Sequence, residues 1–128
     1  MFAITKVLIV ALGGGIGAAS RYLVSVWAVE RFGSGFPYGT LIVNIAGCFI
    51  IGLFMVLVTE KFEVSPEWRL LITTGFLGGL TTFSSFSYET LSLLDSDVRL
   101  AAYNLLANCI IGFTATWLGI NLARYLSV

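Results

Sequence analysis

Residues 73–92 decide the fold, and they read TTGFLGGLTTFSSFSYETLS. This stretch holds nine Ser or Thr residues, three glycines and one glutamate in twenty positions. Hydroxyls that bond to their own helix or face neighbouring helices account for only about three or four of these residues. Gly78-Gly79, followed by Thr81-Thr82, predicts a break in this helix. Because unwound backbone at membrane depth must be buried in protein or line a cavity, we expect an ion site or a pore here.

Apolar runs of bilayer-spanning length extend from this stretch in both directions. The predicted spans are residues 5–28, 39–59, 68–93 and 99–125. Only 11% of the 128 residues are charged and 58% are hydrophobic, whereas a soluble domain has about 25% charged residues. The sequence therefore predicts an all-α integral membrane protein. We expect one domain, residues 1–128, with four transmembrane helices, the third broken near its middle.

The charged residues predict little about the partners of the chain or its orientation in the membrane. Seven Lys and Arg residues balance seven Asp and Glu residues, so no net charge favours binding to nucleic acid. The basic residues divide weakly between the side that carries both termini and the other side: Lys6, Lys61, Arg69 and Arg124 against Arg31 and Arg99. So weak a bias permits insertion in both orientations, and hence an antiparallel pair.

The first span contains two patterns that are typical of other classes of protein. Lys6 and the apolar residues after it resemble a signal peptide, but the apolar run continues beyond Arg21 to spanning length. Residues 13–18, GGGIGA, with Glu30 further on, match the loose dinucleotide-binding fingerprint. That fingerprint requires a βαβ unit, which the following membrane-length helices exclude. The glycines instead read as a small-xxx-small pattern that lets helices pack closely.

The sequence offers no enzyme site. It contains no histidine, so neither a Cys–His nucleophile nor a histidine-containing zinc site can form. Cys48 and Cys109 lie within apolar runs, and we expect both to be small core residues.

Phe83 and Phe86 are three residues apart beyond the predicted break, and they share one helical face. They serve either in ordinary packing or as ring edges, which carry partial positive charge and can face an anion. Glu89 lies one turn further along that face, near the end of the span. An acid within a span is a functional candidate, but so near the end it can also simply be solvated.

Asparagines form the remaining polar features of the spans. Asn44 lies in the second span, where its NH₂ group either donates to an anion or joins two helices. Asn104 and Asn108 are four residues apart on the fourth span, beside Tyr103, and make a second polar stripe.

Three blocks of sequence resemble the small fluoride channels known as Fluc or CrcB. The blocks are residues 13–18 (GGGIGA) with Arg21-Tyr22, residues 39–47 (GTLIVNIAG) and residues 75–86 (GFLGGLTTFSSF). The resemblance covers essentially the whole chain, and the third block is highly specific. It implies an antiparallel, dual-topology homodimer with two narrow pores in the bacterial cytoplasmic (inner) membrane. Fluoride would pass through them out of the cell, down its gradient.

The resemblance also implies roles for particular residues. Phe83 and Phe86 would line the pores with ring edges, and Asn44 would donate to the ion. The backbone carbonyls of Gly78 and Thr81 from both subunits would hold a structural sodium ion. The remaining residues expected along the fluoride path are Arg21 near the aqueous vestibule, together with Thr40, Ser84, Glu89 and Tyr103.

Two other functions compete with a fluoride channel. A proton-coupled exporter of the small multidrug-resistance type needs a carboxylate in its first span, and residues 5–28 contain no Asp or Glu. A non-transporting assembly subunit would leave the polar third span unexplained.

Overall fold

The computed structural model describes residues 2–126, and all of their regular structure is helical. The α-helices are α1 (Phe2–Phe32), α2 (Tyr38–Val56), α3 (Pro66–Arg69), α4 (Gly78–Leu80), α5 (Phe83–Ser96), α6 (Val98–Leu106) and α7 (Gly112–Leu126). Three π-helical segments join them: η1 (Leu57–Lys61), η2 (Leu70–Leu77) and η3 (Ala107–Ile111). Together they form four helices of membrane-spanning length: Ala3–Phe32, Tyr38–Lys61, Pro66–Ser96 and Val98–Leu126. The prediction of four transmembrane helices is confirmed.

The connections end and begin the spans by ordinary capping chemistry. Gly33 follows α1 with φ 82°, and its N–H donates to the Val29 carbonyl over 2.8 Å. A glycine suits this left-handed position because it has no Cβ. Ser65 caps the third span by accepting a hydrogen bond from the Trp68 N–H (3.4 Å), with Pro66 as the first helical residue.

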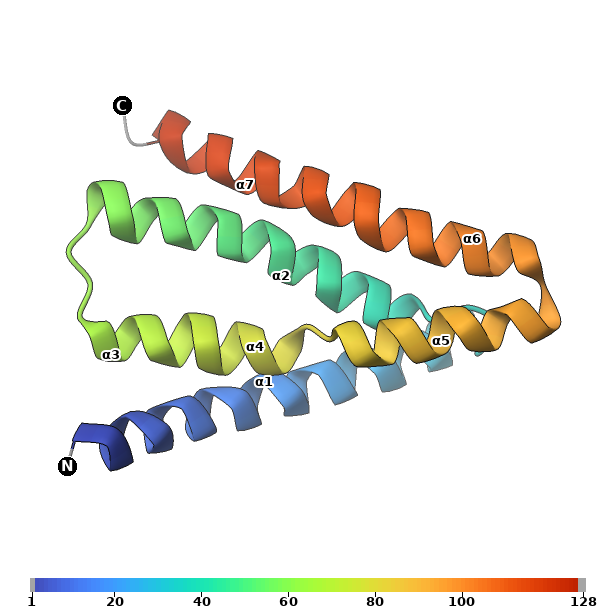
Figure 1. The fold of residues 1–128 in the computed structure, drawn as a ribbon, viewed down its shortest axis with the longest axis horizontal. Coiled ribbons are helices and arrows are strands. Elements are labelled where there is room, and N and C mark those ends of the chain that lie inside the picture. Colours follow the sequence, from blue (N-terminus) through green and yellow to red (C-terminus); the bar gives the residue numbers. More distant parts are fainter. Residues whose placement is uncertain (1, 127–128) are drawn as a thin grey trace.

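Two pairs of spans pack closely (Figure 1), and the second span also contacts both the first and the third. α2 runs along α7, and α1 runs along η2 and α4. Val43, Leu77 and Leu80 form a buried cluster between the second and third spans. Many large apolar side chains elsewhere are exposed, as expected of helices whose surroundings are lipid.

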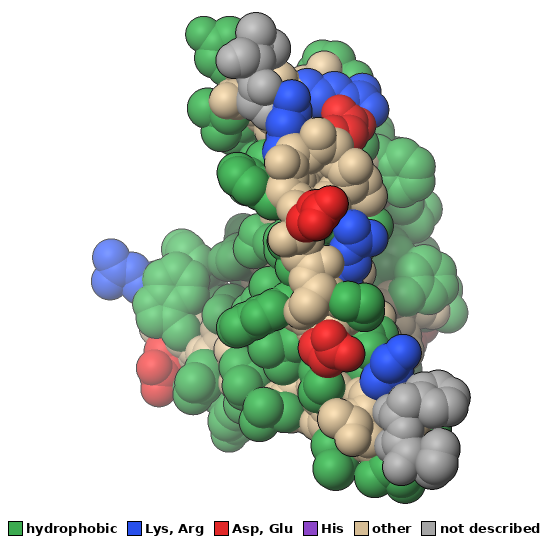
Figure 2. All heavy atoms as spheres, turned by 90° about the vertical axis from the view of Figure 1, so that its left-hand side faces the viewer, with side chains coloured by type: hydrophobic (Ala, Val, Ile, Leu, Met, Phe, Trp, Pro, Cys, Tyr) green, Lys and Arg blue, Asp and Glu red, His purple; other side chains and the backbone are tan. Residues whose placement is uncertain are grey.

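Both termini lie at the same end of the helices (Figure 1), and Figure 2 looks onto that end. Acidic and basic side chains are interspersed across it. Arg124 forms a salt bridge with Glu60 over 3.3 Å, and Arg69 Nη2 donates to the Val58 carbonyl over 2.7 Å. Charged groups of both signs thus gather where a span would leave the lipid.

Glycines let the first span approach the third at backbone distance, which confirms the predicted close packing. A methyl group on Gly17 would lie 2.8 Å from the Leu80 amide nitrogen, and closer still to the Phe76 carbonyl oxygen. A methyl group on Gly79 would lie 3.1 Å from the Ala18 amide nitrogen. These neighbours are backbone atoms, so relief requires moving a whole helix.

Gly17→Ala should therefore destabilise the protein, whereas Gly15→Ala should not. Overpacking costs about 1–3 kcal/mol, and alanine regains at most about 1 kcal/mol through helix propensity. In the described part of the chain, nothing lies within 4 Å of a methyl group placed on Gly15, which makes it a matched control. Thermal unfolding in detergent should show a lower melting temperature for Gly17→Ala alone. Equal melting temperatures for the two variants would contradict this packing.

The third span breaks at Thr81 and Thr82, which lie between α4 and α5. Both residues are extended, with φ −90° and ψ 157° at Thr81 and φ −153° and ψ 125° at Thr82. The predicted break is confirmed, but Gly78 and Gly79 remain helical and do not cause it directly. The helix opens where a side chain of the second span supplies other partners for the backbone.

Candidate functional site

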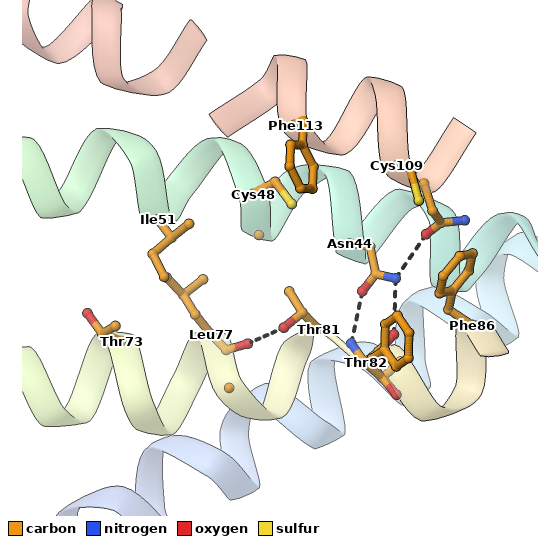
Figure 3. Close-up of a pocket in the computed structure, with 14 residues that line it drawn as sticks. Asn44, Cys48, Ile51, Thr73, Leu77, Thr81, Thr82, Phe86, Cys109 and Phe113 are labelled. Atoms are coloured by element: carbon orange, nitrogen blue, oxygen red, sulfur yellow. Dashed lines mark hydrogen bonds between the residues drawn. The ribbon is translucent and has the colours of Figure 1, made fainter. Parts of the chain in front are cut away.

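The side chain of Asn44 binds the broken backbone at two points (Figure 3). The Thr82 N–H donates to Asn44 Oδ1 over 2.9 Å, and Asn44 Nδ2 donates to the Thr82 carbonyl over 3.1 Å. These bonds compensate the extended peptide for the helical bonds that it has lost. Asn44 thus joins two helices and also holds the break open.

The break removes the helical donors of the Gly78 and Thr81 carbonyls. In a continuous helix, the Thr82 N–H would donate to Gly78 and the Ser85 N–H to Thr81. Here the Thr82 N–H donates to Asn44, and the Ser85 N–H donates to Thr82 Oγ1 over 3.1 Å as an N-cap. The carbonyls of Gly78 and Thr81 are thereby freed to bind other groups.

Arg21 occupies the next carbonyl along the helix. Its Nε donates to the Gly79 carbonyl over 3.0 Å and so joins the first span to the end of α4. A cation at the end of a helix interacts favourably with its carbonyl groups. The sequence suggested a position near a vestibule for Arg21, but it gave no sign of this bond.

A cavity of about 370 Å³ lies beside the break. Figure 3 shows that its walls come from the second, third and fourth spans. Its lining residues are Asn44, Gly47, Cys48, Ile51, Thr73, Leu77, Gly78, Thr81, Thr82, Phe83, Phe86, Asn108, Cys109 and Phe113. The lining contains amide and hydroxyl groups and aromatic rings, but none of these residues carries a charge.

Phe83 and Phe86 meet edge to face in this cavity, with ring centroids 5.5 Å apart and planes at 67°. The shared helical face that the sequence predicted is confirmed. The two rings differ sharply in burial, because Phe86 is 6% exposed and Phe83 is 78% exposed. Phe83 therefore presents its ring to the outside of a single chain.

A chain of hydrogen bonds connects Asn44 with the fourth span. Asn44 Nδ2 donates to Asn108 Oδ1 over 3.0 Å. Asn108 Nδ2 in turn donates to the Asn104 carbonyl and to Asn104 Oδ1, over 2.9 and 3.1 Å. Asn104 is completely buried and donates to Thr90 Oγ1 over 2.8 Å. The sequence indicated a polar stripe at residues 104 and 108, but not its connection to Asn44.

Thr40 and Glu89 form a separate polar pair. Buried Thr40 donates through Oγ1 to Glu89 Oε2 over 3.1 Å. Within the described residues, Glu89 Oε1 is buried and has no hydrogen-bond partner. Both residues line a cavity of about 70 Å³ beside Tyr38 and Gly39, and neither lines the cavity at Asn44. Glu89 is thus bonded within the chain.

The structure also places the other residues for which the sequence gave an expectation, namely Ser84, Tyr103 and the two cysteines. Ser84 is exposed and bonds Thr82 Oγ1 over 3.2 Å. Tyr103 is 59% exposed and is not among the described residues that line either of these cavities. The expectation that Cys109 is a core residue is wrong for a single chain, because it is exposed at the larger cavity. Cys48 is partly buried there.

These features define a four-span helical membrane protein with a neutral polar cavity at an interrupted span. Residues 8–120 match the family described as "CrcB-like protein, Camphor Resistance (CrcB)", and the chain belongs to this family.

Several bacterial proteins named "Fluoride-specific ion channel FluC" are similar over nearly their whole length. The protein of Geotalea uraniireducens is 50% identical over 121 residues, which are 94% of this chain and 98% of the relative. The protein of Sulfurihydrogenibium sp. is 48% identical over 122 residues, with the same coverage of 94% and 98%. The protein of Solibacter usitatus is 46% identical over 120 residues, 93% of this chain and 98% of the relative.

Proposed function

We propose that this chain is a fluoride-selective channel of the cytoplasmic membrane. It lets fluoride leave the cell passively and so lowers fluoride toxicity in the cytoplasm. The observation that carries the proposal is the neutral cavity at the break, where the Asn44 amide and the rings of Phe83 and Phe86 converge. The name of the similar proteins supports it, and it describes an ion channel and not an enzyme.

The chemistry of the cavity suits a small anion. Fluoride is strongly hydrated, so a pore must replace its water with hydrogen-bond donors and other positive groups. The Asn44 amide and the ring edges of Phe83 and Phe86 are such groups. Because none of the cavity-lining residues is charged, an ion can bind there without being trapped. A multidrug exporter would need an acid in the first span, which residues 5–28 lack.

A growth experiment tests the function in cells. Bacteria that lack their own fluoride export should regain growth in fluoride when they express this chain. The same cells carrying an empty vector or the Asn44→Asp variant should remain sensitive. Equal sensitivity of cells with the parent chain and cells with the vector, at confirmed membrane expression, would count against fluoride export.

We further propose that the working unit is an antiparallel homodimer. The cavity is open on one side of a single chain, where Phe83 and Phe113 are 78% and 81% exposed. A second copy would cover this side. The weak charge bias supports insertion in both orientations.

Single cysteines at the connections, in a chain with Cys48 and Cys109 replaced, should be labelled from both sides of native membranes. The expected result is that membrane-impermeant reagents reach about half of the copies from each side. Labelling from one side alone would rule out dual topology.

A sodium ion is proposed at the interface of the two subunits. The carbonyls of Gly78 and Thr81 have lost their helical donors, and backbone oxygens are ligands that suit a hard cation. The ion would add structural stability by coordinating carbonyl oxygens contributed by both subunits.

Preparing the protein in N-methylglucamine instead of sodium should therefore lower the melting temperature of the dimer. One bound ion with a hundredfold excess over its dissociation constant would contribute about 2.7 kcal/mol. Adding sodium back, but not caesium, should restore stability. Identical melting temperatures in all three cations would remove the sodium site.

A further inference from the structure

The amides of Asn44 and Asn108 meet at the cavity, and the other hydrogen bonds of each amide fix its orientation. Asn44 faces the backbone of Thr82, which presents one donor and one acceptor. If the Asn44 amide turned over, its NH₂ group would face the Thr82 N–H and its oxygen would face the Thr82 carbonyl. Both contacts would be repulsive, so Asn44 must direct its second N–H toward the fourth span.

Asn108 is fixed by the same logic. Its Nδ2 donates to the backbone carbonyl of Asn104, which cannot become a donor, and to Asn104 Oδ1. Asn104 cannot turn over either, because its Nδ2 donates to Thr90 Oγ1 while the Thr90 hydroxyl donates to the Phe86 carbonyl over 2.7 Å. The oxygen of Asn108 therefore always faces Asn44.

One consequence concerns the donor that an anion would use. Asn44 Nδ2 has two hydrogens, and protein oxygens accept both: the Thr82 carbonyl and Asn108 Oδ1. The Thr82 carbonyl belongs to the backbone of the break, whereas Asn108 Oδ1 is a side-chain atom at the wall of the same cavity. An ion that binds Asn44 must therefore take the place of Asn108 Oδ1.

We propose that Asn108 sets how tightly the channel holds its ion, by masking the Asn44 donor with a carbonyl oxygen between ions. Conduction requires binding that is strong enough to admit an ion and weak enough to release it. An N–H with no protein partner would hold fluoride more firmly, because no protein hydrogen bond would have to be broken when the ion binds. The inference rests on the proposed fluoride pathway and assigns Asn108 a positioning role within it.

The test is fluoride efflux from liposomes over a series of fluoride concentrations. Asn108→Leu and Asn108→Ser both remove the masking oxygen. Leucine keeps the size of the side chain, and serine keeps a hydroxyl that can bond back to the Asn104 carbonyl. In both variants the half-saturating fluoride concentration should fall roughly two- to tenfold, the value of one hydrogen bond. Maximal efflux should not rise in proportion, because release becomes slower.

Asn121→Leu is the matched control. Asn121 lies on α7, is exposed, and bonds only to the Trp117 carbonyl of its own helix over 2.8 Å in the described structure. Its half-saturating concentration should equal that of the parent. If both Asn108 variants show an unchanged or higher half-saturating concentration while the parent carries fluoride, the masking role is wrong. If the parent itself carries no fluoride, the proposed function falls, and this inference falls with it.

Discussion

Asn44→Asp is expected to lower fluoride efflux at least about a hundredfold. The substitution removes the Asn44 N–H that is available to the ion, worth about 1–3 kcal/mol, and a factor of ten requires only about 1.4 kcal/mol. It also places a negative charge on the proposed fluoride path. The measurement is the initial rate of fluoride efflux per amount of reconstituted protein.

The hydrogen bonds at the break add a structural effect to this variant. A carboxylate at position 44 would face the Thr82 carbonyl and Asn108 Oδ1, two acceptors that the amide now satisfies. The melting temperature must therefore be measured on the same preparations, so that efflux is counted only for folded protein. Asn121→Asp introduces the same charge on the fourth span at a side chain bonded within its own helix. Full efflux by a stable Asn44→Asp variant would show that Asn44 does not contact the ion.

The second large effect on fluoride efflux is expected for substitutions of Phe83 and Phe86. Because only Phe86 is buried, the two substitutions should differ in their effect on stability. Phe83→Ala should lower efflux about tenfold or more and lower the melting temperature less than Phe86→Ala does, because its ring is 78% exposed within the single chain. Phe86→Ala should lower both, because truncating a buried phenylalanine costs about 3–5 kcal/mol of stability.

Phe→Met at either position should be gentler than Phe→Ala. Methionine keeps the bulk and polarisable contact of the ring but lacks its positive edge. Efflux and thermal unfolding of all four variants distinguish a pore from simple packing. Under packing alone, Phe83→Ala would leave efflux per amount of folded protein unchanged, and Phe86→Ala would lower only the yield and stability of the protein.

The four spans could be predicted because each requirement lies within one continuous stretch of sequence. An apolar run of sufficient length forms a helix in lipid whatever its neighbours, since its backbone must bond internally. The glycines of the first span were equally readable, because close packing needs small residues at fixed spacing. The predicted spans fell a few residues short because polar residues at the membrane surface continue the helices to Phe32, Lys61 and Ser96.

The position of the break could not be predicted with the same accuracy. The glycines at 78 and 79 suggested it, but the helix opens at Thr81-Thr82 because Asn44 binds the backbone there. That contact joins residues 38 positions apart and depends on the register between two spans. The same holds for the bond from Arg21 to Gly79 and for the chain of amides through Asn108.

The sequence pattern also did not predict the local geometry of the fourth span. Asn108 and Cys109 lie in the π-helical segment η3, which changes the direction of the side chains relative to a regular helix. No residue type in ANCII signals such a segment. Assigning Asn104 and Asn108 to one stripe was correct, but only the structure shows that Asn108 reaches Asn44.

Anion efflux from liposomes containing the purified protein tests the central claim most directly. Vesicles loaded with equal concentrations of potassium fluoride or potassium chloride are diluted into anion-free buffer, and an ionophore carries the potassium. The account predicts rapid fluoride efflux that depends on the protein, with chloride efflux no faster than from protein-free vesicles. Equal efflux of the two ions, or fluoride efflux no faster than from protein-free vesicles, would contradict it.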